Sequence, residues 1–187
     1  NRVRFTEASF AIPTPSGERD LRIFGQWTQP LGDSREFRTS LSYLRHDFDY
    51  LMPNFAQSNL SGGPGLFVEQ PDHRYDMDAN WRFPVAGDWF AIVGVAASRS
   101  ELDRRENTVS NWRDEDSVTG VATRGQGSMT SASAYAQAEW FATPTLTAYF
   151  GLRYDHHRTR GRVAQTTDPA FDIAYADRSF DAWSPKA

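Results

Sequence analysis

The 187-residue chain contains no cysteine, and of its 20 basic residues only Lys186 is a lysine. The absence of cysteine excludes disulfide scaffolds and thiol-bound zinc, and it is compatible with an exported protein. The net charge of −4 argues against a nucleic-acid-binding protein. We interpret the near absence of lysine as a coding bias toward arginine rather than as selection for anion-binding side chains.

Long hydrophobic runs are also missing. The longest extends from Trp89 to Ala97, far short of the roughly 20 residues that a membrane-spanning helix needs, so a helical membrane protein is excluded. A transmembrane β-strand needs only every second residue to be apolar, so the mean hydropathy of −0.62 does not exclude a β-barrel. Residues Asn1 to Ala11 resemble a strand and not a signal peptide. We therefore expect that any export signal was removed or that the chain begins in mid-protein.

What the chain does have is strict alternation of apolar and polar residues, most clearly between Ser133 and His156. Because strand side chains repeat every two residues, such a hairpin has one face in an apolar medium, either lipid or a protein core, and the other in polar surroundings. The apolar face comprises Ala134, Ala136, Ala138, Trp140, Leu146, Ala148, Phe150, Leu152 and Tyr154. The polar face comprises Tyr135, Gln137, Glu139, Thr147, Arg153 and Asp155.

Turn signals divide the chain into about eight candidate strands, each longer than the five or six residues that are usual in soluble sheets. They are expected at Val3 to Ala11, Asp20 to Gln29, Arg35 to Leu51, His73 to Phe83, Trp89 to Arg99, Thr130 to Phe141, Thr145 to Arg158 and Ala174 to Trp183. The sequence thus predicts an all-β fold with an antiparallel, up-and-down arrangement of long strands.

The connections between these strands alternate between tight turns and long polar loops. Tight turns are expected at Pro30 to Asp33, Pro84 to Asp88 and Thr143 to Thr145, and long loops at Pro53 to Asp72, Ser100 to Gly127 and Thr159 to Ile173. In an up-and-down sheet every second connection lies at the same rim. Short turns at one rim and long loops at the other are typical of outer-membrane β-barrels.

Aromatic residues are placed near both predicted rims. Trp27, Trp81, Trp89 and Trp140 lie close to the tight turns, whereas Tyr43, Tyr75 and Tyr154 lie on apolar faces near the long loops. This is the pattern of the two aromatic girdles of a membrane barrel. One strand departs from the pattern, because Phe90 and Ile92 fall on what should be its polar face, and we expect something apolar to pack there.

The segments Ala134 to Trp140, Thr143 to Thr147, Gly151-Leu-Arg-Tyr-Asp155 and Phe180 to Lys186 resemble the barrel of TonB-dependent outer-membrane receptors. The resemblance is close at Ser133 to Asp155 and Phe180 to Lys186, and elsewhere extends only to the rhythm of strands and loops. It implies energy-coupled uptake of a ferric siderophore, haem or cobalamin in the bacterial outer membrane. The implied partners are outer-membrane lipid, this small-molecule ligand, and a TonB-type coupling protein that acts through a plug domain.

The chain departs from that family pattern in lacking a plug domain, a coupling box and a closing C-terminal strand. We therefore expect residues 1–187 to be a partial barrel domain that forms a curved, open sheet, because such receptor barrels have 22 strands. Within it, Tyr135, Gln137, Glu139, Arg153 and Asp155 are expected to face the lumen and to contact the plug.

Histidine and aspartate are adjacent in the sequence at His46-Asp47, Asp72-His73 and Asp155-His156. A hydrolase could use such residues as a general base and the carboxylate that orients it. Chain neighbours in a strand point to opposite faces, and no Gly-x-Ser-x-Gly motif accompanies them, so we do not expect an enzyme. For the same reason His156 and His157 do not predict a metal site. The segment Ser61 to Gly65 lacks the lysine and helix of a phosphate-binding loop, and we expect no cofactor.

Aromatic and arginine side chains in the long loops are the candidate ligand contacts, because a flat ring beside a guanidinium suits an anionic chelate. These candidates are Phe55, Phe67, Trp112 and Arg124. Covering of neighbouring loop residues is an equal explanation for them. Two alternatives to the receptor fragment stay open: a self-contained small barrel of adhesin or porin type, and a soluble all-β binding domain whose apolar faces pack on one another.

Overall fold

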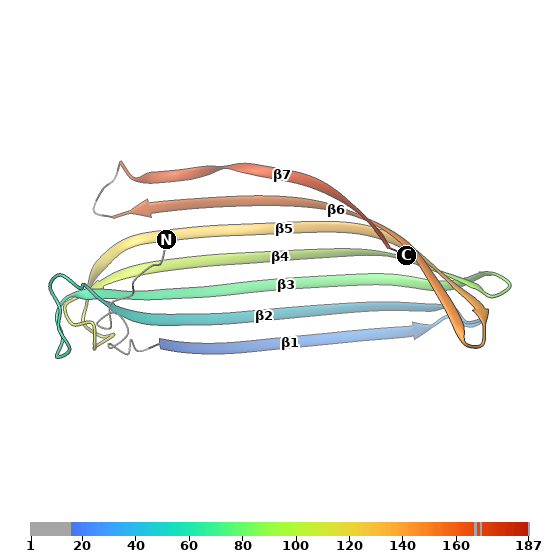
Figure 1. The fold of residues 1–187 in the computed structure, drawn as a ribbon, viewed down its shortest axis with the longest axis horizontal. Helices are drawn as coiled ribbons and strands as arrows, with labels where there is room; N and C mark the ends of the chain where they lie inside the picture. The colour runs from blue at the N-terminus through green and yellow to red at the C-terminus, as the bar shows by residue number, and fades with distance from the viewer. Residues whose placement is uncertain (1–15, 167, 169, 187) are drawn as a thin grey trace, which may run out of the picture.

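The computed structural model describes residues 16–166, 168 and 170–186. They form one antiparallel sheet in which every strand pairs with its neighbours along the chain (Figure 1). The seven strands are β1 (Ser16–Pro30), β2 (Glu36–Pro53), β3 (Gly65–Ala86), β4 (Trp89–Val109), β5 (Val118–Thr143), β6 (Leu146–Gln165) and β7 (Asp172–Lys186). The first and last of them, β1 and β7, do not pair with each other. The prediction of an open, up-and-down, all-β sheet is thus confirmed.

Seven of the eight predicted strands correspond to β1 to β7, and the eighth, Val3 to Ala11, lies outside the described residues. The predicted long loops were wrong in extent, because the strands continue well into them. The connections at that rim are residues 54–64, 110–117 and 166–171. Glycine, proline and charged residues were taken as loop signals, but in the structure Pro71, Gly125 and Arg160 belong to β3, β5 and β6.

The two rims nevertheless differ as expected. The turns between β1 and β2, β3 and β4, and β5 and β6 comprise only residues 31–35, 87–88 and 144–145, and they lie at the opposite end of the sheet from the longer loops (Figure 1). The first turn contains three successive residues with positive φ, Gly32, Asp33 and Ser34. Glycine and aspartate accept that conformation more readily than most residues, which fixes the chain reversal here.

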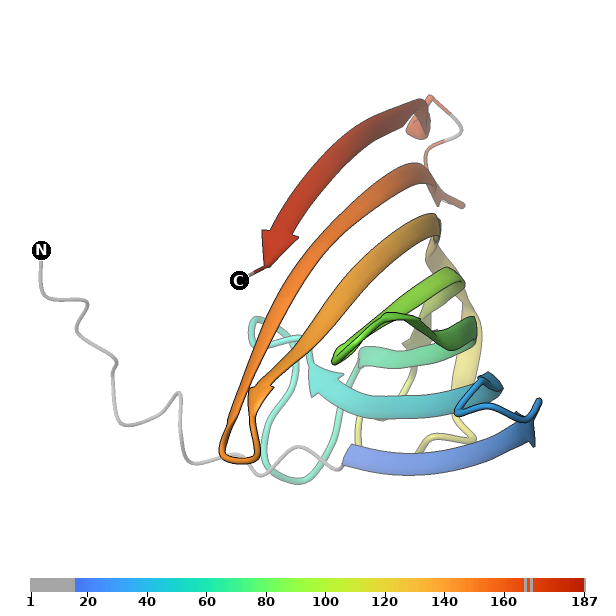
Figure 2. The same ribbon diagram turned by 90° about the vertical axis from the view of Figure 1, so that its right-hand side faces the viewer.

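The sheet is a single curved layer (Figure 2). Large apolar side chains on one face remain exposed, among them Leu41 at 59% and Val95 at 51%. The buried apolar cluster of Leu51, Val109 and Trp112, against which Phe67 packs, lies at the long-loop rim. Among the described residues no second layer covers the apolar face, so the predicted alternative of a soluble sandwich does not match this arrangement. None of the described residues forms a helix long and apolar enough to cross a membrane.

The aromatic residues of the apolar face follow lines that are inclined to the strands. Tyr75 is in register with Arg158 of β6, whereas Tyr154 lies four residues closer to the tight turns. At about 3.3 Å per residue and about 4.8 Å per strand, this offset over three strand spacings corresponds to an inclination of about 40°. Trp140 is displaced in the same direction relative to the residue in register with Trp27. Barrel strands tilt by about 35–45°, so each line is level in the frame of a membrane barrel.

Candidate functional site

The face opposite the apolar one is lined by polar side chains that contact each other across intervening strands. The Arg82 Nη2 atom of β3 lies 3.1 Å from Glu139 Oε2 of β5, and the Tyr135 hydroxyl donates to Asp78 Oδ2 at 2.9 Å. Both contacts bridge β4. Side chains that meet over a strand must converge, which places this polar face on the concave side of the curved sheet (Figure 2).

A second polar group on the concave face joins β5 and β6. Ser133 donates a hydrogen bond to Asp155 at 2.6 Å, and Arg153 donates to both residues at 2.8 Å. Ser133 and Asp155 are buried although the face is open. Charge-assisted hydrogen bonds of this kind hold side chains in fixed positions, so the face presents an ordered polar surface.

The structure therefore brings the five predicted lumen residues together on one face. Tyr135 and Arg153 are directly opposite each other in the β5–β6 register, and Gln137 faces Gly151. Gln137 and Glu139 are half-buried. The partners on β3, Asp78 and Arg82, were not among the predicted site residues, because sequence alone does not give the register between β3 and β5.

Phe90, one of the two apolar residues expected to interrupt this polar face, is covered by the sheet's own side chains. The Arg82 guanidinium lies 4.0 Å from the centre of the Phe90 ring, and Phe90 meets Phe141 edge to face at 5.7 Å. The ring of Tyr135 lies over Gly94, where any Cβ atom would collide with it. Glycine is needed at this position so that the tyrosine can reach Asp78.

The four predicted loop contacts fall into different environments. Phe55 lies in the β2–β3 loop and is 68% exposed, whereas Trp112 in the β4–β5 loop is only 2% exposed. The expectation that Phe67 and Arg124 lie in loops was wrong, because they belong to β3 and β5. Phe67 packs against the cluster around Trp112. Arg124 is exposed and pairs in register with Arg105 on the convex side.

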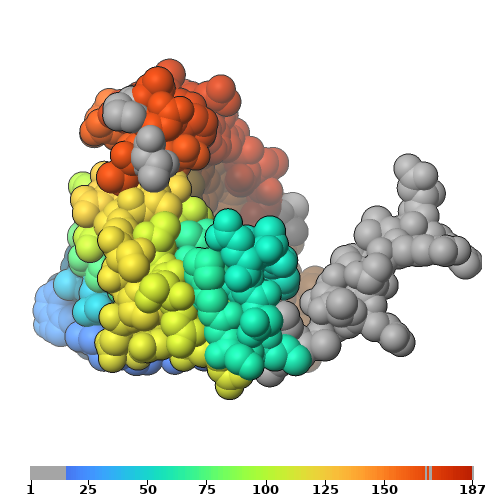
Figure 3. Space-filling view, turned by 90° about the vertical axis from the view of Figure 1, so that its left-hand side faces the viewer, coloured from blue at the N-terminus to red at the C-terminus, as the bar shows by residue number. Residues whose placement is uncertain are grey.

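Trp112 holds two loops together. Its indole Nε1 donates to the Asn59 carbonyl at 3.1 Å, and its backbone N–H donates to the Gly63 carbonyl at 2.9 Å. Arg113 Nη1 donates to the Leu60 carbonyl at 2.6 Å. The β2–β3 and β4–β5 loops consequently lie side by side at the long-loop end of the molecule (Figure 3). These hydrogen bonds join the two loops, residues 54–64 and 110–117, into one ordered loop unit.

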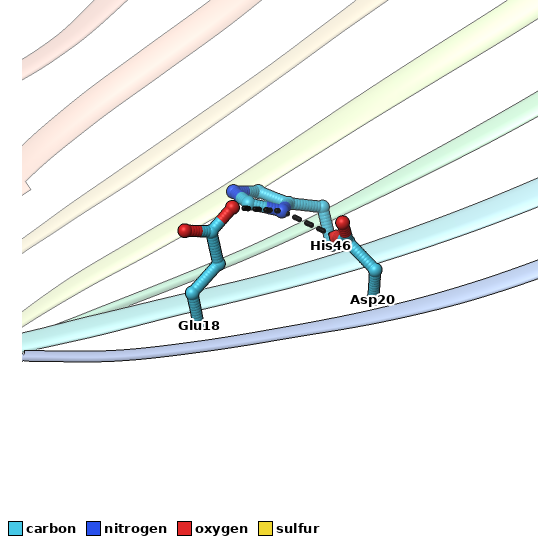
Figure 4. Close-up of side chains that lie close together, drawn as sticks. All are labelled: Glu18, Asp20 and His46. Carbon is cyan, nitrogen blue, oxygen red and sulfur yellow. Dashed lines mark hydrogen bonds and ion pairs between the residues drawn. The ribbon is translucent and has the colours of Figure 1, made fainter.

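The three histidines of the predicted Asp–His pairs contact other residues than their chain neighbours. His46 Nδ1 lies 2.6 Å from Asp20 Oδ1 and 3.8 Å from Glu18 Oε1, both on β1 (Figure 4). His73 contacts the Tyr43 hydroxyl, and His156 contacts Asp181.

The hydrogen bond to Asp20 raises the pKa of the His46 imidazole above its ordinary value. The donor atoms of Glu18, Asp20 and His46 lie within 4.8 Å of one another, a spacing that a cation site would require. The two carboxylate side chains are exposed, and the ion pair with Asp20 accounts for the arrangement on its own.

Comparison with known proteins identifies the class to which this sheet belongs. Residues 4–187 match the family model described as TonB dependent receptor-like, beta-barrel. The match spans nearly the whole chain, so the chain belongs to this family of outer-membrane proteins. The predicted resemblance and localisation are thereby confirmed, and the alternative of an adhesin-type or porin-type barrel is set aside.

Solved structures give the same fold. The unliganded ferric citrate transporter FecA matches with a TM-score of 0.65 and 11% identity, over 91% of this chain and 24% of that one. The ferric yersiniabactin uptake receptor FyuA from Yersinia pestis gives a TM-score of 0.60 and 11% identity, over 94% of this chain and 27% of that one.

The ferric-catecholate import receptor Fiu from E. coli K12, in its open form, gives a TM-score of 0.57 and 11% identity, over 90% of this chain and 32% of that one. The chain thus spans about a quarter to a third of the length of these three proteins. No curated protein matches it in sequence.

Proposed function

We propose that the chain forms part of the barrel wall of a receptor that takes up a scarce ligand, such as a ferric siderophore, across the outer membrane. The observation that carries this proposal is the opposite character of the two faces. The convex face is apolar, exposed and bounded by inclined lines of tyrosine and tryptophan, and the concave face carries linked polar groups. A wall between lipid and a polar passage requires both properties.

In this proposal the concave side chains Tyr135, Gln137, Glu139, Arg153 and Asp155 line the passage and contact a plug domain. Coupling to a TonB-type protein would act through that plug. The names of the similar solved proteins, which carry ferric citrate, ferric yersiniabactin and ferric catecholates, support a ferric chelate over haem or cobalamin.

The loop unit at the long-loop end would help to capture the ligand. Phe55 is exposed and available for direct contact. Trp112 is enclosed, so its contribution would be to position the loop that carries Phe55. Phe67 would support these loops through the cluster around Trp112, whereas Arg124 lies on the convex side and would not face the passage.

The direct test is uptake by cells that produce the complete receptor. A deletion strain would be supplied with radioactive iron as ferric citrate, ferric yersiniabactin or a ferric catecholate, with labelled haem and cobalamin in parallel. We expect accumulation of one iron chelate to depend on the receptor and on TonB. Receptor-independent accumulation of all five compounds would contradict the proposal.

We further propose that the chain has no enzymatic role. The complete receptor should hydrolyse neither peptide nor ester substrates, and replacing His46, His73 or His156 by alanine should change nothing in such assays. Turnover that is lost on any of these replacements would overturn this part of the proposal.

A further inference from the structure

A row of basic side chains follows the convex face of β6 between Tyr154 and the long loops. The members of this basic row are His156, Arg158, Arg160 and Arg162, and all four are exposed. They occupy every second position of the strand after Tyr154. Because side chains of a strand alternate between its two faces, the basic row continues the apolar side of the sheet toward the long-loop rim.

The basic row extends well above the level of the tyrosines. Arg158 lies four residues beyond Tyr154 on the same strand, and Arg162 lies four residues further on. At about 3.3 Å per residue and a tilt of about 40°, Arg158 is about 10 Å and Arg162 about 20 Å above Tyr154. The headgroup layer of an ordinary bilayer is only about 5–8 Å thick on each side. The upper part of the row therefore lies beyond the reach of a phospholipid phosphate.

Two arginines of the basic row share one carboxylate. Asp177 of β7 accepts a hydrogen bond from Arg158 Nη2 at 2.6 Å and another from Arg160 Nε at 3.0 Å. A register shift between Thr159 and Gly161 accompanies this arrangement. The side chains of Arg158 and Arg160 are 51% and 55% exposed. One carboxylate between two guanidinium groups leaves a positive charge that is open to an anion from outside the sheet.

Strand β5, on the other side of the basic row, contributes donors but no carboxylate. The β5 residues in register with the three arginines of the row are Thr130, Ser128 and Gln126. The next residue on this face of β5 is Arg124, which is directly opposite Arg105 of β4. Like charges directly opposite each other are destabilising unless an anion lies between them. The convex sides of β5 and β6 thus combine guanidinium, hydroxyl and amide donors.

We propose that this convex surface of β5 and β6 binds the phosphorylated headgroup of an outer-leaflet glycolipid. Guanidinium forks bind phosphate through two parallel hydrogen bonds, and the hydroxyl and amide side chains of β5 would donate to sugar oxygens. Phosphate groups carried on sugars about 10–20 Å above the hydrocarbon match the height of Arg158 to Arg162. Lipopolysaccharide is a lipid of this chemistry. The inference goes beyond the proposed function, because it concerns the face opposite the passage.

The test compares three lipids on the complete receptor in detergent. They are lipopolysaccharide with a phosphorylated core oligosaccharide, lipid A without the core, and phosphatidylglycerol. Binding would be measured by native mass spectrometry at equal lipid concentrations. We expect the core-bearing lipid to bind about tenfold more tightly than either of the others, since one charge-assisted hydrogen bond is worth about that factor.

Two variants test the shared carboxylate in opposite directions. Arg160→Gln removes the excess positive charge and leaves Arg158 with Asp177, so it should weaken binding of the core-bearing lipid by about tenfold. Asp177→Asn removes the anion that competes with phosphate, so it should strengthen binding severalfold. A merely structural role of this cluster would not give changes of opposite sign.

Arg104→Gln is the matched control. It removes the same charge from the concave face of β4, where Arg104 donates to Glu106 at 2.7 Å, and it should bind the core-bearing lipid like the unchanged receptor. Equal binding of the three lipids, unchanged binding by Arg160→Gln, or an equal loss in Arg104→Gln would overturn the inference. None of these outcomes bears on the uptake test of the proposed function, because no transport is measured.

Discussion

At the scale of single residues, Trp112 shows how an enclosed side chain can fix the position of loops that carry exposed residues. Its ring fills the apolar cluster beneath the loops, and its two N–H groups donate to carbonyls of the other loop. Three glycines in and beside the β2–β3 loop allow this packing. Gly62 and Gly63 have positive φ, and a Cβ atom on Gly65 would overlap Trp112.

Replacing Trp112 by alanine should release the two loops. Truncating a buried tryptophan costs about 3–5 kcal/mol of stability. We expect a loss of this size to leave the two loops disordered. We expect faster hydrogen exchange at residues 54–64 and 110–117, measured by mass spectrometry on the complete receptor, with the strands unchanged. Trp112→Phe keeps most of the packing and should show a smaller effect. Unchanged exchange in the alanine variant would show that Trp112 does not hold the loops.

His46 gives a pH-dependent prediction. The hydrogen bond with Asp20 raises the pKa of His46, so the stabilisation from this pair is fully present below the unfolded pKa of about 6.5 and is lost as the pH rises through the folded pKa. Asp20→Asn should lower the pKa of His46, as followed by NMR of ¹³C-labelled histidine. Asp47→Asn is the control, because Asp47 is the chain neighbour but lies on the other face. An equal shift in both variants would refute the assignment of faces.

At the scale of elements, the contact between Arg82 and Glu139 ties β3 to β5 over the strand between them. Arg82→Leu leaves a half-buried carboxylate without its partner, and the expected loss is about 1–3 kcal/mol in unfolding free energy. Arg38→Leu removes a more exposed pair with Glu36 and should cost about 0–1 kcal/mol. Urea unfolding of the complete barrel in lipid vesicles measures both, and equal losses would contradict the proposed bridge.

Strand β4 offers two adjacent residues that lie on opposite faces of the sheet. Val95 lies on the apolar face and Ala96 on the concave face beside Ser133. An arginine in contact with hydrocarbon costs about 2–4 kcal/mol, so Val95→Arg should destabilise the barrel by that amount in lipid, and Ala96→Arg by clearly less. The same vesicle unfolding experiment compares them. The reverse order would mean that the faces are assigned wrongly.

At the scale of the whole molecule, most of the architecture could be predicted from alternation. The run from Ser133 to His156 specifies strands, their faces and the tight turn between them. The rims could be predicted because short and long connections alternate. The extent of the strands could not, because polar residues on both faces, as at Arg104 and Arg160, are compatible with either a loop or a strand that has left the membrane.

For the candidate site, the sequence predicted only the face of the sheet on which each residue lies. Which face Tyr135 and Arg153 occupy follows from their positions in one strand pair. Their partners on β3 depend on register across β4, and the enclosure of Trp112 depends on two loops far apart in the chain. Pro71, which lies within β3, was a sequence signal that pointed to a loop.

The central claim is that hydrocarbon contacts the alternate apolar residues of the convex face. Spin labels placed singly at residues 77 to 81 of β3, in the complete receptor in lipid vesicles, test it most directly. The account predicts that accessibility to oxygen peaks at Met77, Ala79 and Trp81, and that accessibility to a water-soluble nickel chelate peaks at Asp78 and Asn80. High nickel accessibility at the odd positions, or low accessibility to both reagents there, would contradict it.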